Sequence, residues 1–331
     1  ILDRAPEAHL FPLWQVLRCH SACTMTVKVT ELRPFGEAAI AEAARLVLAG
    51  EPVAVPTETV YGLAADATNG EAVARIYAAK GRPSFNPLIV HVPDLATAER
   101  IGEFSFAARM LALVHWPGPL TLVVPLAPGA QIASLVTAGL TTVALRVPAH
   151  PAMQALLHAT GKPLAAPSAN ESGRISPTRA DHVLASLNGR IPLIIDGGPT
   201  ERGIESTIIG ATGDELRLLR PGPIEVPEAL PASGGIEAPG MMSSHYAPSK
   251  PVRLNAIDKR ESEWLIGFGR YAGDATLSAI GSLEEAAANL FAVLHEADAR
   301  NVERIAVAPI PEQGLGLAIN DRLRRAAAER S

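Results

Sequence analysis

Apolar and polar positions follow two different periods along this chain, and these periods predict helices and strands in alternation. Apolar residues recur at helical spacing over 35–48, before a glycine, and again over 70–79. The short apolar runs VAVP and LIVHV, on either side of the second helix, indicate strands. Further helices are predicted over 95–113 and 151–160, and a strand over 141–147. The alternation across 27–224 therefore predicts an α/β domain with a mixed sheet.

A second, smaller domain is predicted after a stretch rich in proline, glycine and serine. Residues 225–251 lack hydrophobic periodicity and indicate a long irregular linker. Short apolar runs and two helical segments then alternate over 252–331, which predicts a Rossmann-like domain. Residues 1–24 have no clear periodicity and precede a typical start, Met25. We interpret them as a non-native extension or a dispensable arm.

Composition and charge exclude several classes of protein. An apolar content of 48% with 19% charged residues is ordinary for a globular chain. The net charge of −5 and the small number of aromatic residues argue against a large nucleic-acid surface, so any RNA contact is expected to be local or weak. Both cysteines, Cys19 and Cys23, lie near the start, which excludes a disulfide framework in the rest of the chain. Because no run approaches the roughly 18 apolar residues of a membrane span, we expect a cytoplasmic protein.

A pair of cations follows the second predicted helix. Lys80 and Arg82 lie on a turn stiffened by glycine and proline, close in sequence to a threonine-rich turn after Pro56. Arginine binds phosphate oxygens in a fork and lysine acts as a point charge, so this pair suits a polyanion, although a solvated surface turn is the alternative. The Walker pattern GxxxxGK[ST] is absent from the sequence. Side-chain cations would therefore have to hold a phosphate.

Two further polar residues interrupt apolar strands. Arg146 shares a strand face with Thr142, which lies about 13 Å away along an extended chain. A half-buried arginine is costly unless it meets an anion, which is either a ligand or a nearby carboxylate. His91 in LIVHV has the same two interpretations, as a ligand contact or as a core histidine with its hydrogen bonds satisfied.

Eight motifs occur in order along the chain: PTETVYGL, KGRPxxNPLIVHV, PGPLTLV, ALRVP, PSAN, IESTI, LRPG and HYAP. Together they resemble the YrdC family, in the long two-domain form of the L-threonylcarbamoyladenylate synthases, and the resemblance covers 27–327. It implies a twisted open sheet followed by a Rossmann-like domain. It also implies that L-threonine, bicarbonate or carbon dioxide, and ATP react to threonylcarbamoyl-AMP, pyrophosphate and water. Downstream threonylcarbamoyl transferases would then form N6-threonylcarbamoyladenosine next to the anticodon of tRNAs that read ANN codons.

The resemblance also assigns residues to the two larger substrates. For L-threonine it implies contacts from Thr59, His91, Arg146, Ala166 and Ser206, and for ATP from Arg82, Asn86, Thr142, Ser168, Ser176, Arg220 and Tyr246. Lys80 joins the ATP set on chemical grounds and, with Arg82, is expected to stabilise charge during the reaction.

The remaining expectations concern the linker and the metal ion. An aromatic residue in a linker has no helix or strand to pack against, so Tyr246 is expected to belong to a lid, formed by 225–251, that closes over ATP. The sequence contains neither an HExxH nor a GxSxG pattern, so we expect neither protein metal ligands nor a covalent nucleophile. Mg²⁺ would arrive bound to ATP.

Two other functions are compatible with such a fold. One is a module that grips RNA in a basic concavity, against which the complete threonine set and the HYAP motif argue. The other is a carbamoyl-transfer domain of the kind found in hydrogenase-maturation proteins, which would be expected beside acylphosphatase and zinc-finger segments that the sequence lacks. Release of pyrophosphate that requires both threonine and bicarbonate separates the three functions.

Overall fold

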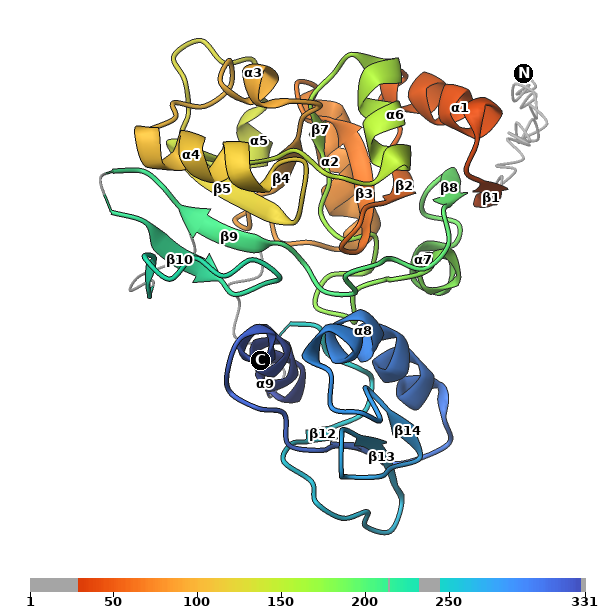
Figure 1. Cartoon of the computed structure of the whole chain (residues 1–331). Helices are drawn as coiled ribbons and strands as arrows, with labels where there is room; N and C mark the ends of the chain where they lie inside the picture. Colours follow the sequence, from red (N-terminus) through yellow and green to blue (C-terminus); the bar gives the residue numbers. More distant parts are fainter. Residues whose placement is uncertain (1–28, 214, 232–244, 329–331) are drawn as a thin grey trace, which may run out of the picture.

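The computed structural model describes residues 29–213, 215–231 and 245–328, which form a larger and a smaller α/β unit (Figure 1). The extension predicted at 1–24 and the central part of the predicted linker lie outside the described residues. The strands of the larger unit are β1 (Glu31–Pro34), β2 (Val53–Pro56), β3 (Tyr61–Asp66), β4 (Ile89–His91), β5 (Leu120–Pro125), β6 (Thr142–Arg146), β7 (Leu164–Ala165), β8 (Leu193–Asp196), β9 (Thr207–Gly210), β10 (Arg217–Arg220) and β11 (Leu230–Pro231).

These strands form one sheet in the order β1-β8-β2-β3-β7-β4-β6-β5-β9-β10-β11. Parallel pairs, such as β4 with β6, lie beside antiparallel pairs, such as β2 with β3. The predicted mixed sheet is therefore confirmed. Its helices are α1 (Glu37–Leu48), α2 (Gly70–Lys80), α3 (Leu95–Ala98), α4 (Phe106–His115), α5 (Ser134–Thr137), α6 (Pro151–Thr160) and α7 (Ala180–Leu187).

Helices cover both faces of this sheet, and strand alternation decides which side chain joins which core. Val53 and Val55 of β2 pack in a cluster with residues of α1 and α6. Ala54, between them, belongs to the opposite cluster, which contains residues of α2, α4 and α7. Burial on both faces explains why the strands are almost continuously apolar.

One predicted helix is two helices in the structure. The segment predicted as helical over 95–113 forms α3 and α4, with an interruption at Gly102. A Cβ atom at Gly102 would lie 2.4 Å from Cγ2 of Val124, so only glycine allows the chain to pass this close to β5. Ser105 then caps α4 by accepting a hydrogen bond from the Ala108 N–H at 3.2 Å. Packing against the sheet overrides the helical period here.

Strand β3 differs from the prediction, which placed a polar loop between the strand VAVP and the helix at Gly70. Every residue of β3 is buried, and the strand pairs with β2 and β7. Its glycine and alanines have weak intrinsic preference for strands, so its conformation comes from its neighbours in the sheet. Because β2 and β3 are antiparallel, residues 57–60 become the tip of a tight hairpin.

The smaller unit is a four-stranded parallel sheet with two helices, consistent with the predicted Rossmann-like domain. Its strands are β12 (Val252–Arg253), β13 (Glu263–Gly267), β14 (Ala275–Thr276) and β15 (Arg304–Val307), in the order β12-β15-β13-β14. Its helices are α8 (Leu283–Ala299) and α9 (Leu315–Ala327), which face the larger unit in Figure 1. Phe291 of α8 shares one apolar cluster with Val60, Ile175 and Ile204 of the larger unit. The two units therefore have a common core where they meet.

The boundary between the units also differs from the prediction. Residues 225–231 were predicted to begin the linker, but β11 pairs with β10 at the edge of the large sheet. Val226 and Ala229 pack against the main core of that unit. The first unit therefore extends through Pro231, because scattered apolar residues in a proline-rich segment find a surface to cover.

Two histidines stack across the boundary between the units. The rings of His182 in α7 and His295 in α8 have centroids 3.9 Å apart and an interplanar angle of 22°. Burial, and then the neighbouring His295, lower the pKa of His182 to about 3, and burial lowers the pKa of His295 to about 4. Asp181 and Asp298 oppose these shifts, whereas Arg179 adds to them. Both rings are therefore neutral in the folded protein at neutral pH.

This pair predicts a loss of stability in mild acid. An unfolded histidine has a pKa near 6.5, so below that pH the unfolded chain binds protons that the folded chain does not. The pair should contribute about 1–3 kcal/mol to the fall in the free energy of unfolding between pH 7.5 and 5.5, measured by urea denaturation. The variant His182→Gln/His295→Gln should lose this contribution and keep that of other buried histidines such as His91 and His245, whereas replacing the exposed His158 should preserve the dependence of the parent. An equal acid loss in the double variant and the parent would contradict this assignment.

Candidate functional site

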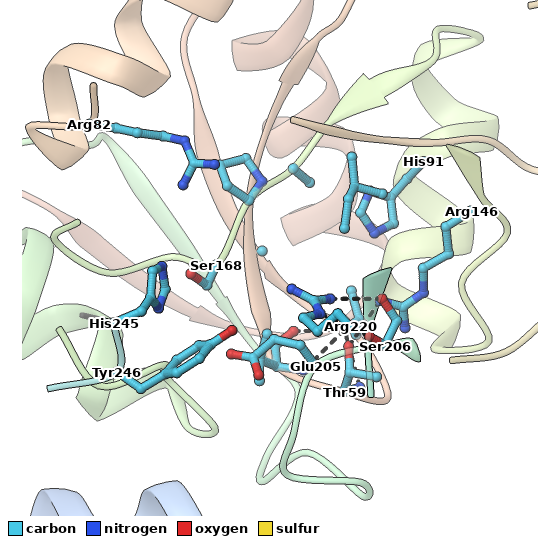
Figure 2. A pocket seen from close by; sticks show the side chains of 16 residues that line it. Thr59, Arg82, His91, Arg146, Ser168, Glu205, Ser206, Arg220, His245 and Tyr246 are labelled. Carbon is cyan, nitrogen blue, oxygen red and sulfur yellow. Dashed lines mark hydrogen bonds between the residues drawn. The ribbon is translucent and has the colours of Figure 1, made fainter. Parts of the chain in front are cut away.

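A cavity of about 50 Å³ lies where the β2–β3 hairpin tip, the sheet and the segment after the linker meet (Figure 2). Most of the predicted site residues line it: Thr59, Arg82, His91, Arg146, Ala166, Ser168, Ser206, Arg220 and Tyr246. These residues come from positions up to 187 apart in the chain, and the fold brings them to one place. Glu205 and His245 also line the cavity, although the sequence analysis gave neither a role.

Four predicted residues do not line the cavity. Lys80 lies at the end of α2 and donates hydrogen bonds to the backbone carbonyls of Ser168 and Asn170, so it holds the PSAN loop. The backbone carbonyl of Asn86 accepts a hydrogen bond from Arg82, and Ser176 donates to Glu205. Thr142 begins β6, opposite Pro125, and the structure does not bring it to the cavity.

Arg146 forms an ion pair with the carboxylate of Glu58. A nearby carboxylate was one of the two anions predicted to accompany this arginine, the other being a ligand. The Arg146 Nη2 donates to Oε1 of Glu58 at 2.6 Å and its Nη1 to the Thr59 hydroxyl at 3.0 Å, while its Nε donates to the Gly118 carbonyl at 3.1 Å. Burial raises the pKa of Glu58, but the Arg146 guanidinium outweighs this effect and holds that pKa below its ordinary value. These bonds use three of the five N–H donors of a guanidinium, so Arg146 is held in place and retains donors for a ligand.

His91 pairs in register with Arg146 across β4 and β6. Its side chain is buried, and its Nδ1 has no hydrogen-bond partner among the described residues. Burial, and then the charge of Arg146, lower the pKa of His91 to about 3, so the ring is neutral. A buried ring nitrogen without a partner fits a ligand contact better than a core histidine with satisfied hydrogen bonds.

Ser206 and Arg220, which the resemblance assigned to different substrates, are joined by hydrogen bonds. The Ser206 hydroxyl lies 2.8 Å from that of Thr121, and Nη2 of Arg220 donates to it at 3.1 Å. Nε of Arg220 also donates to the Ser206 carbonyl at 3.0 Å. Arg220, expected at ATP, therefore also orients the threonine-side hydroxyl. Thr121 was missed, and its signal in the sequence is a lone hydroxyl in the apolar strand LTLVV.

Arg82 lines the opposite end of the cavity, and Lys80 lies beside that end, bonded to the Ser168 carbonyl. Arg82 donates to the carbonyls of Asn86 at 3.3 Å and Pro87 at 2.9 Å, and burial lowers its pKa to about 10. Burial, with the charge of Arg82, also lowers the pKa of Lys80. In the described parts of the chain, neither residue forms an ion pair with a carboxylate. Two buried cations whose partners among the described residues include no carboxylate favour an anionic ligand.

Tyr246 is buried, and its environment corrects one expectation. It does have a helix to pack against: its ring lies 5.5 Å from that of Phe291 in α8. Its hydroxyl, in contrast, has no hydrogen-bond partner among the described residues and points into the cavity in Figure 2. His245, whose ring is 4.1 Å from that of Tyr246, likewise has an Nδ1 without a partner there. Together these residues cover the cavity.

Comparison with known proteins places the chain among close relatives. The Sua5/YciO/YrdC family, described as "Telomere recombination", matches residues 45–222, and the family described as "Threonylcarbamoyl-AMP synthase, C-terminal domain" matches 204–328. A protein of Bacillus subtilis named threonylcarbamoyl-AMP synthase is 41% identical over 92% of this chain and 97% of its own length. A namesake from Pyrococcus abyssi is 40% identical over 92% and 99%. The crystal structure of P. abyssi Sua5 complexed with L-threonine superposes with a TM-score of 0.82, at 38% identity, over 90% of this chain and 97% of that one.

Proposed function

This chain belongs to the threonylcarbamoyl-AMP synthase family, and on that premise we propose that the cavity between Arg82 and Arg146 is where it joins its substrates. The activity of the family is nucleotidyl transfer from ATP to form threonylcarbamoyl-AMP, a precursor for tRNA modification. The single observation that carries the assignment of the cavity is the buried Arg82, which lines it and, within the described residues, forms no ion pair with a carboxylate. Arg82 forms the ATP end, with Lys80 holding the adjoining Ser168 backbone, and Arg146, Thr59 and Ser206 form the threonine end.

In this arrangement, the residues of the protein position substrates and neutralise charge. The threonine amine first attacks bicarbonate or carbon dioxide; with bicarbonate, a carbamate forms and water leaves. A carbamate oxygen then attacks the α-phosphorus of ATP, and the bond to pyrophosphate breaks. Arg146 would hold the threonine carboxylate, while Arg82 stabilises charge on the phosphates. An arginine already held in place stabilises the charge that develops in the transition state most effectively, because it need not reorient during the reaction.

Mg²⁺ does not fit a dedicated protein site in this cavity. Glu205 is the acidic residue that lines it, and its two oxygens already accept hydrogen bonds from Ser176 and Arg322. No group of three or more potential metal ligands occurs among the described residues. Mg²⁺ would therefore arrive as part of the ATP substrate.

The size of the cavity implies movement of the residues that cover it. Sites for ligands of this size usually enclose roughly 300–1,000 Å³, whereas this cavity measures about 50 Å³. Tyr246 and His245 both line this cavity. We expect both to shift when ATP binds and to exclude water from the mixed anhydride afterwards.

Other aspects of the function remain expectations. Within the described residues, no helix has the length and apolar character required to cross a bilayer. We place the enzyme in the cytoplasm, where its product would pass to the threonylcarbamoyl transferases. Direct contact with tRNA would be weak, because the chain carries a net charge of −5.

Pyrophosphate release tests the function and the substrate at once. Release from ATP should require both L-threonine and bicarbonate, and serine should replace threonine better than 2-aminobutyrate does. A pocket that bonds the substrate hydroxyl leaves buried polar groups unpaired when that hydroxyl is missing, which typically reduces kcat/KM by about 10⁴-fold. Equal turnover of 2-aminobutyrate and threonine would show that the hydroxyl is not recognised, and release without bicarbonate would contradict the proposed reaction.

A further inference from the structure

Arg322, in helix α9 of the smaller unit, has a fully buried side chain although it carries a permanent charge. Its Nε donates to Oε2 of Glu205 at 3.0 Å. Its Nη1 donates to the Pro221 carbonyl at 2.8 Å and to Oδ2 of Asp321 at 2.9 Å. A buried arginine requires such partners, and two of these belong to the larger unit.

Both contacts lie in loops that carry residues of the cavity. Glu205 directly precedes Ser206, and Pro221 directly follows Arg220. Ser206 and Arg220 are themselves joined by hydrogen bonds. One side chain of the smaller unit therefore holds the two adjoining loops that form one wall of the cavity.

The guanidinium also lies against the residue that covers the cavity. Its Cζ is 5.4 Å from the centroid of the Tyr246 ring, which also packs near Phe291. Burial alone would lower the pKa of Arg322, but Tyr246, Glu205 and Asp321 outweigh it and raise that pKa. Tyr246 is held between two side chains of the smaller unit.

The ion pair between Arg322 and Glu205 affects the binding of an anionic substrate, because Glu205 lines the cavity. Its Oε1 accepts a hydrogen bond from Ser176 and its Oε2 from Arg322, so the direction of the carboxylate is determined at both oxygens. Ser176 and Tyr246, beside it, are residues that the resemblance assigns to ATP. An uncompensated carboxylate at this place would repel the phosphates, and Arg322 supplies the compensating charge.

The backbone before Glu205 is equally dependent on the smaller unit. Gly203 has a φ of +68°, and a Cβ atom there would lie 2.3 Å from the Ala288 carbonyl oxygen in α8. Ile204 is buried in the apolar cluster shared by the two units. The loop that presents Glu205 therefore rests directly on α8, and its position follows that of the smaller unit.

From these contacts we infer that Arg322 is a positioning residue for ATP binding: it orients and neutralises Glu205 and supports the Tyr246 ring. The nucleotide end of the cavity is then complete only when the smaller unit is docked. This gives the smaller unit a role in the reaction, and the inference rests on the proposed function because it takes ATP as the ligand of that end.

Direct binding measurements on the full chain test the inference independently of turnover. Arg322→Met should weaken ATP binding, measured by titration calorimetry, by about tenfold or more, since the Glu205 carboxylate left without its partner repels the phosphates. Binding of L-threonine should change by less than about threefold, because Arg146 is untouched and Arg220 still holds Ser206 by two hydrogen bonds. The matched control is Arg324→Met in the same helix, whose pair with Glu312 is exposed, and it should bind ATP as the parent does.

A second variant separates a positioning role from a merely structural one. Glu205→Gln/Arg322→Met removes the uncompensated charge and should recover part of the ATP affinity lost in Arg322→Met. The inference is overturned if Arg322→Met binds ATP within twofold of the parent, or if affinity for both substrates falls together without recovery in the double variant. A parent that binds ATP but releases no pyrophosphate would contradict the proposed function and leave this binding test intact.

Discussion

Replacing Arg146 by methionine should reduce kcat/KM for L-threonine by about 100-fold or more. The change removes donors expected at the threonine carboxylate, and a charge-assisted contact of this kind typically contributes about 1.5–3 kcal/mol. It also releases the Thr59 hydroxyl, which Arg146 holds at 3.0 Å. The measurement is the initial rate of pyrophosphate release at varied threonine and saturating ATP.

Arg146→Met also leaves the Glu58 carboxylate buried without its partner, which typically destabilises a protein by about 3–5 kcal/mol. The variant Glu58→Gln/Arg146→Met separates this effect from substrate binding. The neutral amide can still accept the Ala149 N–H, so urea denaturation should show that most of the stability is recovered. Activity should stay low in the double variant, whereas Arg109→Met, which removes an exposed pair with Glu99, should have no effect. Recovery of activity together with stability would mean that Arg146 serves the fold alone.

Replacing Arg82 by alanine should lower kcat/KM for ATP by about 10- to 100-fold. Arg82 is buried, and in the described structure its hydrogen bonds go to backbone carbonyls, so a bound phosphate would be its anionic partner. Its pKa of about 10 keeps it charged at neutral pH, so the loss should be nearly constant between pH 7 and 8.5. Pyrophosphate release at subsaturating ATP measures the effect.

Two further variants define the origin of this loss. Arg82→Lys keeps the charge but not the fork, and should fall between Arg82→Ala and the parent. Arg75→Ala is the matched control, since Arg75 lies on the exposed face of α2 and donates to the Gly50 carbonyl away from the cavity. An unchanged rate in Arg82→Ala at low ATP would remove Arg82 from the ATP end.

Helices α2 and α6 were predicted well from the sequence because their signals are local. Helix α6 begins and ends at the predicted residues, Pro151 and Thr160. Helix α2 begins after Asn69, whose side chain accepts from two backbone N–H groups, and ends at Gly81 in the left-handed conformation. Caps and apolar spacing act within about four residues, so the chain itself carries that information. Strand β3 was missed because its alanines and glycine become a strand only between two partners.

For the site as well, some features could be predicted from the sequence and others depended on the tertiary structure. Residue types and their order in the sequence determined which side chains have suitable chemistry, including Arg82, Arg146 and Ser206. Only the tertiary structure decided their partners: Glu58 is 88 positions from Arg146, and Glu205 is 117 positions from Arg322. Nothing near Arg322 in the sequence distinguishes it from the exposed Arg324, since burial and ion pairing depend on which distant surfaces meet. The sequence alone therefore determined the chemistry of the cavity, and the packing of the two units decided which charges are compensated within it.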